Sequence, residues 1–317
     1  MILVAGESLI DLIVEPDGRV VASPGGGPFN AARTIARLGH PTRFLGRFSA
    51  DPFGQFLMGR LRQDGVELAL PDPVDNPTAI ATVAVSALGV PRYWFHLAGT
   101  AGFLLGQLTA QRALEADITA LHIGTLGLVV EPMATELERV AASLPGTALL
   151  LLDPNCRPQV IPDADAYRAR IWRILARADL VKASVEDLAF LVPGASVPDA
   201  ARALLAGGAR AVLVTDGPAM IRAFAGNDHL AVPVPPAEVV DTVGAGDSFG
   251  GGFLAWWVER GLGREGLADT AQLRAAATAA ARVAAVTCSR AGAEPPWRHE
   301  LAASDGWGDL PVQLGRI

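Results

Sequence analysis

The chain has 317 residues, of which 50% are apolar and 19% are charged, a balance typical of a protein with a large buried core. This composition, with no glycine period, excludes a disordered or a collagen-like chain. The 26 basic and 33 acidic side chains give a net charge of −7. Because no basic stripe accompanies this acidic balance, we expect no nucleic-acid partner.

Two further properties narrow the class of protein. Cys156 and Cys288 are the only cysteines, too few for a disulfide framework and wrongly spaced for a zinc site, so we expect free thiols. No apolar run reaches membrane-spanning length, and the N-terminus lacks the basic region of a signal peptide. We therefore expect a cytoplasmic protein without a membrane partner. Lys182 is the only lysine, which excludes any mechanism that needs a second one.

Short apolar runs rich in β-formers alternate with helical patterns along most of the chain. The predicted strands are Ile2–Ala5, Thr42–Phe48, Ala120–Ile123, Ala148–Leu152, Leu180–Lys182 and Ala211–Thr215. Pro28 and Gly39 frame one helix, and Asp51-Pro52 and Gly65 frame another. The Ala-rich segments Ala245–Gly261 and Thr270–Thr287 also predict helices. This alternation predicts an α/β fold with a mostly parallel sheet flanked by helices.

Two segments interrupt the alternation. Residues of about 12–24 and 78–98 hold paired β-type runs with turn signals between them and no helix. We expect them to form a small antiparallel sheet that projects from the main body. The length of the chain is compatible with one domain that has such an appendage and also with two ordinary domains.

The strongest chemical signal is Asp241-Thr242-Val243-Gly244-Ala245-Gly246-Asp247, which runs into an apolar helix. Glycines before a helix aim free amides outward, and the helix dipole makes such a turn suitable for a phosphate. A carboxylate beside a phosphate is unfavourable for binding alone. It is useful if Asp247 takes a proton from a hydroxyl that attacks the phosphate. The alternative is that Asp247 only complements the helix N-terminus, where acidic residues are common.

Other phosphate-binding motifs do not fit. A P-loop needs Gly-Lys before Ser or Thr, but Lys182 follows a valine. The Gly244-Ala245-Gly246 run has the wrong spacing for a dinucleotide fingerprint and lies near the C-terminal end. The loops that define protein kinases are absent from the sequence.

Two weaker signals lie near the N-terminus. Gly25-Gly26-Gly27-Pro28-Phe29-Asn30 enters the first framed helix, and Asp11 follows the first predicted strand. Glycines let a ligand approach the backbone, and an amide offers both a donor and an acceptor. Taken singly, a glycine-rich turn and an aspartate near a strand end are ordinary turn features.

Together these segments, in this order, resemble the PfkB (ribokinase-like) carbohydrate kinase family over essentially the whole chain. Asp153-Pro154-Asn155-x-Arg157, Thr215-Asp216-Gly217 and Gly292-Ala293 fit the resemblance as well. The resemblance implies one ribokinase-like domain over residues 1–317, in which the small sheet is a lid that closes over a sugar and excludes water. The implied cofactors are ATP and Mg²⁺, and a requirement for a monovalent cation stays open.

The resemblance also assigns residues to roles. Asp247 matches the base that deprotonates the sugar hydroxyl, and the amides of Gly244, Ala245 and Gly246 match an anion hole. The expected sugar-binding residues are Asp11, Gly26, Gly27, Asn30, Arg157 and His96. The expected nucleotide-binding residues are Thr215, Gly217, Thr242, Gly244 and Gly246.

Several positions separate the branches of the family. Gly-Gly-Gly-Pro-Phe-Asn, without a lysine, is similar to fructokinases and 2-keto-3-deoxygluconate kinases. His96-Leu97 stands where that branch commonly has Tyr-Arg, so the expected substrate is a neutral sugar, foremost fructose. 2-Keto-3-deoxygluconate is the alternative, a nucleoside is third, and a non-catalytic sugar or nucleotide sensor is a rival of another class. Arg157 either contacts the substrate or pairs with Asp153 or Asp163.

Ser184-Val185-Glu186-Asp187 stands where the family often has Asn-x-x-Glu near magnesium and phosphate. Asp187 is therefore a candidate metal ligand, but the same spacing is typical of a capping box at a helix start. The predicted lid has an exposed face and open edges. We therefore expect a homodimer formed through the lid.

Overall fold

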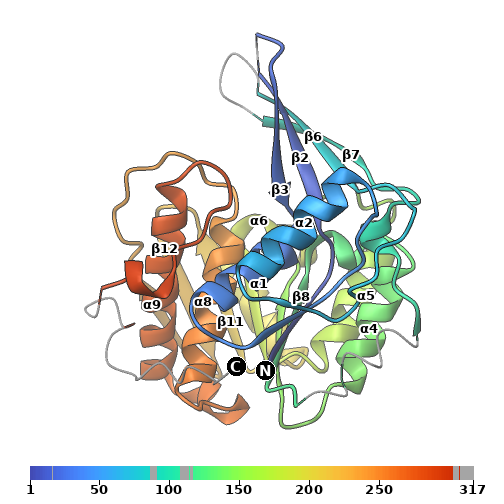
Figure 1. The fold of residues 1–317 in the computed structure, drawn as a ribbon. Helices are drawn as coiled ribbons and strands as arrows, with labels where there is room; N and C mark the ends of the chain where they lie inside the picture. Colours follow the sequence, from blue (N-terminus) through green and yellow to red (C-terminus); the bar gives the residue numbers. More distant parts are fainter. Residues whose placement is uncertain (16, 86–90, 108–113, 115–116, 303–306, 308–317) are drawn as a thin grey trace.

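The computed structural model describes residues 1–15, 17–85, 91–107, 114, 117–302 and 307. Within them, a nine-stranded sheet has the order β13-β12-β11-β10-β9-β8-β1-β4-β5 (Figure 1). Its strands are β1 (Ile2–Ala5), β4 (Thr42–Leu45), β5 (Glu67–Leu68), β8 (Ala120–Gly124), β9 (Leu149–Asp153), β10 (Leu180–Ser184), β11 (Ala211–Asp216), β12 (Met220–Ala225) and β13 (Asp228–Val232). Strands β5 to β11 of this order pair in parallel, as predicted.

Helices cover both faces of the sheet. One side carries α1 (Gly27–Arg37), α2 (Pro52–Gln63), α8 (Ala245–Glu259) and α9 (Thr270–Cys288). The other carries α4 (Met133–Ser143), α5 (Ala164–Leu175), α6 (Val185–Leu191) and α7 (Val197–Ala206). Short 3₁₀ turns are η1 (Ala101–Phe103), η2 (Thr125–Leu128), η3 (Arg264–Ala268) and η4 (Arg298–Glu300). The predicted α/β class is therefore confirmed.

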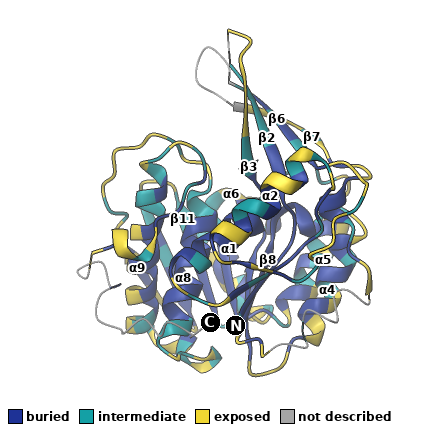
Figure 2. Cartoon of the chain, viewed as in Figure 1, coloured by how far each residue is buried: buried dark blue, intermediate teal, exposed yellow. Residues whose placement is uncertain are grey.

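The sheet separates two hydrophobic cores, and Figure 2 shows the strands in the middle of the sheet as buried. In β1, Ile2 and Val4 face one core and Leu3 and Ala5 face the other, and all four side chains are buried. Strands covered on both faces have continuous apolar runs in their sequence, which explains why these strands could be predicted. No described helix combines the length and the apolar character needed to cross a membrane.

The second sheet has the order β3-β2-β6-β7 and projects from the body (Figure 1). Its strands are β2 (Leu9–Val14), β3 (Val20–Gly25), β6 (Ile80–Val85) and β7 (Pro91–His96). Each hairpin is antiparallel, as predicted, but β2 and β6 join the hairpins by a parallel pairing. The small sheet is therefore mixed, because its halves come from two separate excursions of the chain.

The helices α1 and α2 begin at the proline and capping residues from which they were predicted. Pro28 lies in the first turn of α1, and the Asp51 side chain caps α2 by accepting a hydrogen bond from the amide of Gly54 at 2.8 Å. A proline in the first turn loses no helical hydrogen bond. The antiparallel hairpin of β12 and β13 was not predicted. It extends one edge of the main sheet beyond β11.

Candidate active site

A cavity of about 360 Å³ lies between the small sheet and the carboxyl ends of β1, β8 and β9. In parallel α/β sheets, ligands bind at this end of the strands. The cavity is lined by Glu7, Leu9, Asp11, Gly26, Gly27, Asn30, Tyr93, Phe95, Thr125, Leu126, Asn155, Arg157, Gln159, Thr242, Val243, Gly244, Gly246 and Asp247. The two sequence segments that carried the strongest signals thus meet on one cavity.

Asp247 occupies the wall of this cavity in the first turn of α8 and is 8% exposed. The side-chain amide of Asn30, in α1, donates a hydrogen bond to Asp247 Oδ2 at 2.9 Å. Asn30 Oδ1 is buried and has no partner among the described residues. Asn30 was expected to hold the sugar, and it also fixes the orientation of the carboxylate. Its free oxygen leaves it able to accept a hydrogen bond from a ligand hydroxyl.

The turn before α8 provides free amides, but not all of those expected. Gly244 is the N-cap with a left-handed φ of 77°, a conformation that favours glycine. The Ala245 amide donates to Thr242 O at 3.2 Å, so it is occupied within the turn. Among the described residues, the amides of Gly244, Gly246 and Asp247 have no acceptor. The expected anion site therefore offers the free amides of Gly244, Gly246 and Asp247, and not that of Ala245.

Two further carboxylates face the cavity. Burial, and then the nearby Asp247, raise the pKa of Asp11 to about 6, although Arg157 acts in the opposite sense. Glu7 was not predicted as a site residue. It accepts hydrogen bonds from the Thr125 hydroxyl and from the amide of Gly127 at 2.8 Å, and burial raises its pKa to about 7. Its position directly after β1 was a signal that could have identified it.

Arg157 lines the cavity and does not form either of the ion pairs considered from the sequence. Its Nη1 donates to the Asn155 side chain at 2.7 Å and to the carbonyls of Asn155 and Cys156. Asp153 pairs with Lys182 instead, and Asp163 caps α5. The guanidinium is thus held at the cavity by its own loop.

His96 does not reach the cavity, contrary to expectation. It is exposed, whereas Tyr93 and Phe95 of the same strand line the cavity. Because neighbouring side chains of a strand point to opposite faces, a strand that directs Phe95 inward directs His96 outward. The cavity-facing residues of β7 are therefore the two aromatic rings, which stack at 5.9 Å between centroids.

The expected nucleotide-binding residues lie in two places. Thr242, Gly244 and Gly246 line the cavity. Thr215, the penultimate residue of β11, pairs with Ser184 of β10, and Gly217 follows the strand in an exposed left-handed turn. Neither Thr215 nor Gly217 lines the cavity, but both lie at the same carboxyl edge of the sheet.

Asp187 is a helix cap. Its Oδ2 accepts from the Ser184 amide at 2.7 Å, the Ser184 hydroxyl accepts from the Asp187 amide, and together they form a capping box. Its Oδ1 accepts from the Cys156 amide at 2.6 Å. Asp187 is buried and does not line the cavity. The expectation that Asp187 binds a metal directly has no support in this geometry, because both oxygens already satisfy backbone amides.

A buried polar cluster behind the anion site was not anticipated. Lys182 Nζ donates to Asp153 Oδ2 at 3.0 Å, and Nζ lies 2.8 Å from where a side chain on Gly246 would begin. Both ring nitrogens of the buried His122 lack partners among the described residues, and burial lowers its pKa to about 3. The only lysine is therefore enclosed next to the anion site rather than exposed.

The pfkB family carbohydrate kinase model matches residues 1–300. The chain belongs to the PfkB family. It is 35% identical over 260 residues to a fructokinase of Rhizobium leguminosarum bv. trifolii, covering 80% of this chain and 79% of that protein. It is 31% identical over 307 residues to probable fructokinase-5 of Arabidopsis thaliana, covering 93% of each.

Solved structures agree with this membership. A fructokinase with bound ATP from Xylella fastidiosa is 28% identical and superposes with a TM-score of 0.82, over 92% of this chain and 93% of that one. A fructokinase from Vibrio cholerae O395 with fructose, ADP and calcium is 26% identical with a TM-score of 0.77, over 92% and 94%. The PfkB chain is thus a carbohydrate kinase, which sets aside the non-catalytic sensor.

Proposed function

We propose that the protein transfers the γ-phosphoryl group of ATP to a hydroxyl of a neutral sugar, foremost fructose, with Asp247 as the general base. The observation that carries this proposal is the placement of Asp247. Its carboxylate is anchored by Asn30, lies on a cavity of sugar size, and is adjacent to the free amides of Gly246 and Asp247. A base and an anion site at one point suit an in-line transfer of a phosphoryl group.

The residues that line the cavity would have different roles in the reaction. Asp11 and the free Oδ1 of Asn30 accept hydrogen bonds from sugar hydroxyls and so orient the sugar. Asp247 accepts the proton of the attacking hydroxyl as its oxygen bonds to the γ-phosphorus, and ADP leaves. The free amides stabilise the negative charge on the transferred group. Tyr93 and Phe95 bring the projecting sheet to the cavity, and closure of this lid would exclude water.

ATP as the donor is supported by the relatives. The Xylella structure contains ATP and the Vibrio structure contains ADP and fructose. The described residues hold no group of three or more His, Cys, Asp or Glu side chains placed to bind a metal. Mg²⁺ bound through phosphates and water needs only one or two carboxylates. The Mg²⁺ that we propose would therefore enter with the nucleotide.

The charge of the cavity favours a neutral sugar. Glu7, Asp11 and Asp247 line it, and Arg157 is the only cation among the described residues that line it. A sugar acid would meet this excess of carboxylates, whereas hydroxyls can donate to them. Fructose is placed first because the curated relatives are fructokinases.

The proposal is tested by measuring ADP release with a panel of neutral sugars, sugar acids and nucleosides. We expect the highest kcat/KM with fructose or another neutral sugar. A kcat/KM for 2-keto-3-deoxygluconate well above that for fructose would reject the neutral-sugar assignment. It would also identify Arg157 as a clamp for the substrate carboxylate, since its guanidinium already faces the cavity.

A further inference from the structure

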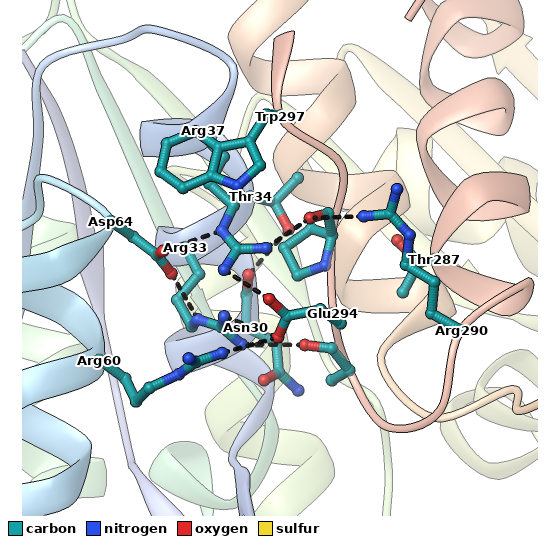
Figure 3. Close-up of polar contacts among 12 residues, drawn as sticks. Asn30, Arg33, Thr34, Arg37, Arg60, Asp64, Thr287, Arg290, Glu294 and Trp297 are labelled. Carbon is teal, nitrogen blue, oxygen red and sulfur yellow. Dashed lines mark hydrogen bonds and ion pairs between the residues drawn. The ribbon is translucent and has the colours of Figure 1, made fainter. Parts of the chain in front are cut away.

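Two buried arginines extend from α1 just beyond Asn30. Arg33 is 0% exposed and Arg37 is 5% exposed. Their Nε atoms donate to the two oxygens of Asp64, at 2.6 Å from Arg33 and 2.9 Å from Arg37. Asp64 is itself buried at the C-cap of α2 (Figure 3). One carboxylate thus fixes both guanidinium groups on the same side.

The other side of each guanidinium holds the segment that follows α9. Arg33 donates to Ala293 O at 3.0 Å and to Glu294 at 2.9 Å. Arg37 donates to Pro295 O at 2.7 Å and pairs with Glu294 at 2.5 Å (Figure 3). We call Arg33, Arg37, Asp64 and Glu294 the arginine clasp. It ties residues 293–295 to α1 through backbone carbonyls as well as through charges.

The segment held by the clasp supports the anion site from behind. A side chain on Gly244 would begin 2.5 Å from Ala293 Cβ, so Ala293 packs directly against the turn. The Gly292 amide donates to Asp241 Oδ2 at 2.9 Å, at the start of the same turn. Any displacement of residues 292–293 would therefore move the amides that precede and open α8.

Helix α1 thus contacts both parts of the proposed active site, which are the general base and the turn that binds the anion. Asn30 holds the carboxylate of Asp247, and one turn later Arg33 holds Ala293 behind Gly244. Stability alone is a poor explanation for this arrangement. Buried ion pairs lose much of their Coulombic gain to desolvation, and apolar residues of the same volume often stabilise as well or better.

We propose that Arg33 is a positioning residue for phosphoryl transfer, which keeps the anion-binding turn in register with Asp247 through Ala293; this rests on the proposed function. Arg37 and Asp64 hold Arg33 and the segment in place. None of the four clasp residues lines the cavity. The effect of the clasp is expected on kcat more than on the KM for the sugar, because Asp11 and Asn30 do not depend on residues 293–295.

The test compares Arg33→Met with Arg60→Met. Arg60 also pairs with Glu294 at 2.9 Å, but its side chain is 29% exposed, and among the described residues it makes no hydrogen bond to the carbonyl of Ala293 or Pro295. We expect Arg33→Met to lower kcat about 10–100-fold, the usual effect of a small misplacement at a reacting centre, with the sugar KM little changed. Arg60→Met should keep kcat within about twofold.

Arg33→Lys covers the case in which the methionine variant does not fold. Lysine keeps the charge beside Asp64 but cannot reach Asp64, Ala293 and Glu294 together, so kcat should still fall. Hydrogen exchange provides a readout without turnover. The hydrogen-bonded amides of Ala245 and Ser248, which donate to Thr242 O and Gly244 O, should exchange faster in the Arg33 variants and not in Arg60→Met. Folded Arg33 variants with wild-type kcat and exchange would overturn the proposal. The kinetic measurements use any sugar that the wild-type protein phosphorylates. If it phosphorylates no sugar of the panel, the proposed function is rejected, and hydrogen exchange alone then tests the proposal for Arg33.

Discussion

Asp247 is the residue on which the proposed chemistry depends most directly. In Asp247→Asn, the amide keeps the shape of the side chain but cannot accept the sugar proton. We expect kcat to fall about 10²–10⁴-fold, the usual contribution of a general base. Sugar affinity should change little, because Asp11 also lines the cavity. The measurement is kcat on the folded fraction, together with the sugar dissociation constant by calorimetry.

The competing explanation for Asp247 makes a different prediction. If the carboxylate only complements the N-terminus of α8, the asparagine variant should lose some stability and keep its turnover. A folded variant within a few-fold of the wild-type kcat would reject Asp247 as the base.

Glu7 predicts a pH dependence of stability. Its pKa is about 7 in the folded protein against an ordinary value of 4.5. Between these values the unfolded chain releases the proton and the folded protein retains it, so stability falls as pH rises through this window. The loss attributable to Glu7 approaches about 3 kcal/mol by pH 8, at about 1.4 kcal/mol per pKa unit.

The Glu7→Gln variant isolates this contribution. Denaturant unfolding of both proteins at pH 5 and pH 8 should show a much smaller loss for the variant. Asp11, whose pKa is also raised by burial, contributes equally to both proteins and cancels in the comparison. An identical loss of stability between the two pH values in both proteins would show that Glu7 is ionised at low pH in the folded state.

The residues that the sequence could and could not predict differ in a physical way. Asp247 and Asn30 lie in the first turns of helices that glycine-rich segments open, and that local context is visible in the sequence. Burial raises the pKa of Glu7, against the hydrogen bonds from Thr125 and Gly127, and these partners lie about 120 positions away in the chain. His96 was predicted because it stands where related kinases commonly have the Tyr of Tyr-Arg. Phe95 lines the cavity instead, since a shift of one residue in a strand reverses the face and the pairing with β6 fixes the register.

At the scale of elements, the turn before α8 is the most constrained. An alanine at Gly244 would adopt an unfavourable φ of 77° and would also begin 2.5 Å from Ala293. Gly39→Ala is a matched control, since Gly39 has a φ of 92° but no atom within 4 Å of the added carbon. Both variants should lose about 1–2 kcal/mol from the backbone strain. Only Gly244→Ala should also lose kcat, by about tenfold or more.

Unfolding midpoints and kcat measured on both glycine variants check this expectation. Equal kcat values in the two variants would mean that the position of the turn is not important for turnover.

Secondary structure was predictable where the pattern of apolar residues agreed with the proline, glycine and capping residues at the ends of the elements. The buried parallel strands and the helices framed by Pro28 and Asp51 fall close to their predicted bounds. The hairpin of β12 and β13 was missed although Gly226-Asn227 lies at its turn. Strand β13 is at the edge of the sheet and alternates between exposed and buried residues, a weaker apolar pattern than that of a strand buried on both faces.

At the scale of the whole molecule, the small sheet predicts self-association. Val20, Val21 and Trp94 are 55%, 37% and 45% exposed on it, and β3 and β7 are its edge strands. Pairing with a second copy would cover these side chains and edges. We expect a dimer in light scattering, and Trp94→Glu should shift it toward the monomer.

Phe56→Glu is the control for this experiment, because Phe56 is 45% exposed on α2 and not on the small sheet. It should leave the dimer intact. A monomer mass that does not change with concentration in the wild type would reject dimerisation through the lid.

The enclosed Lys182 also determines how the protein reacts with reagents for amines. Its side chain carries the only ε-amine of the chain, is 5% exposed and is held by Asp153. Acylating reagents should therefore leave residue 182 unmodified while the fold is intact and label it only after the sheet opens. The extent of acylation at that one position, measured by mass spectrometry, would report the unfolded fraction of this protein in a mixture.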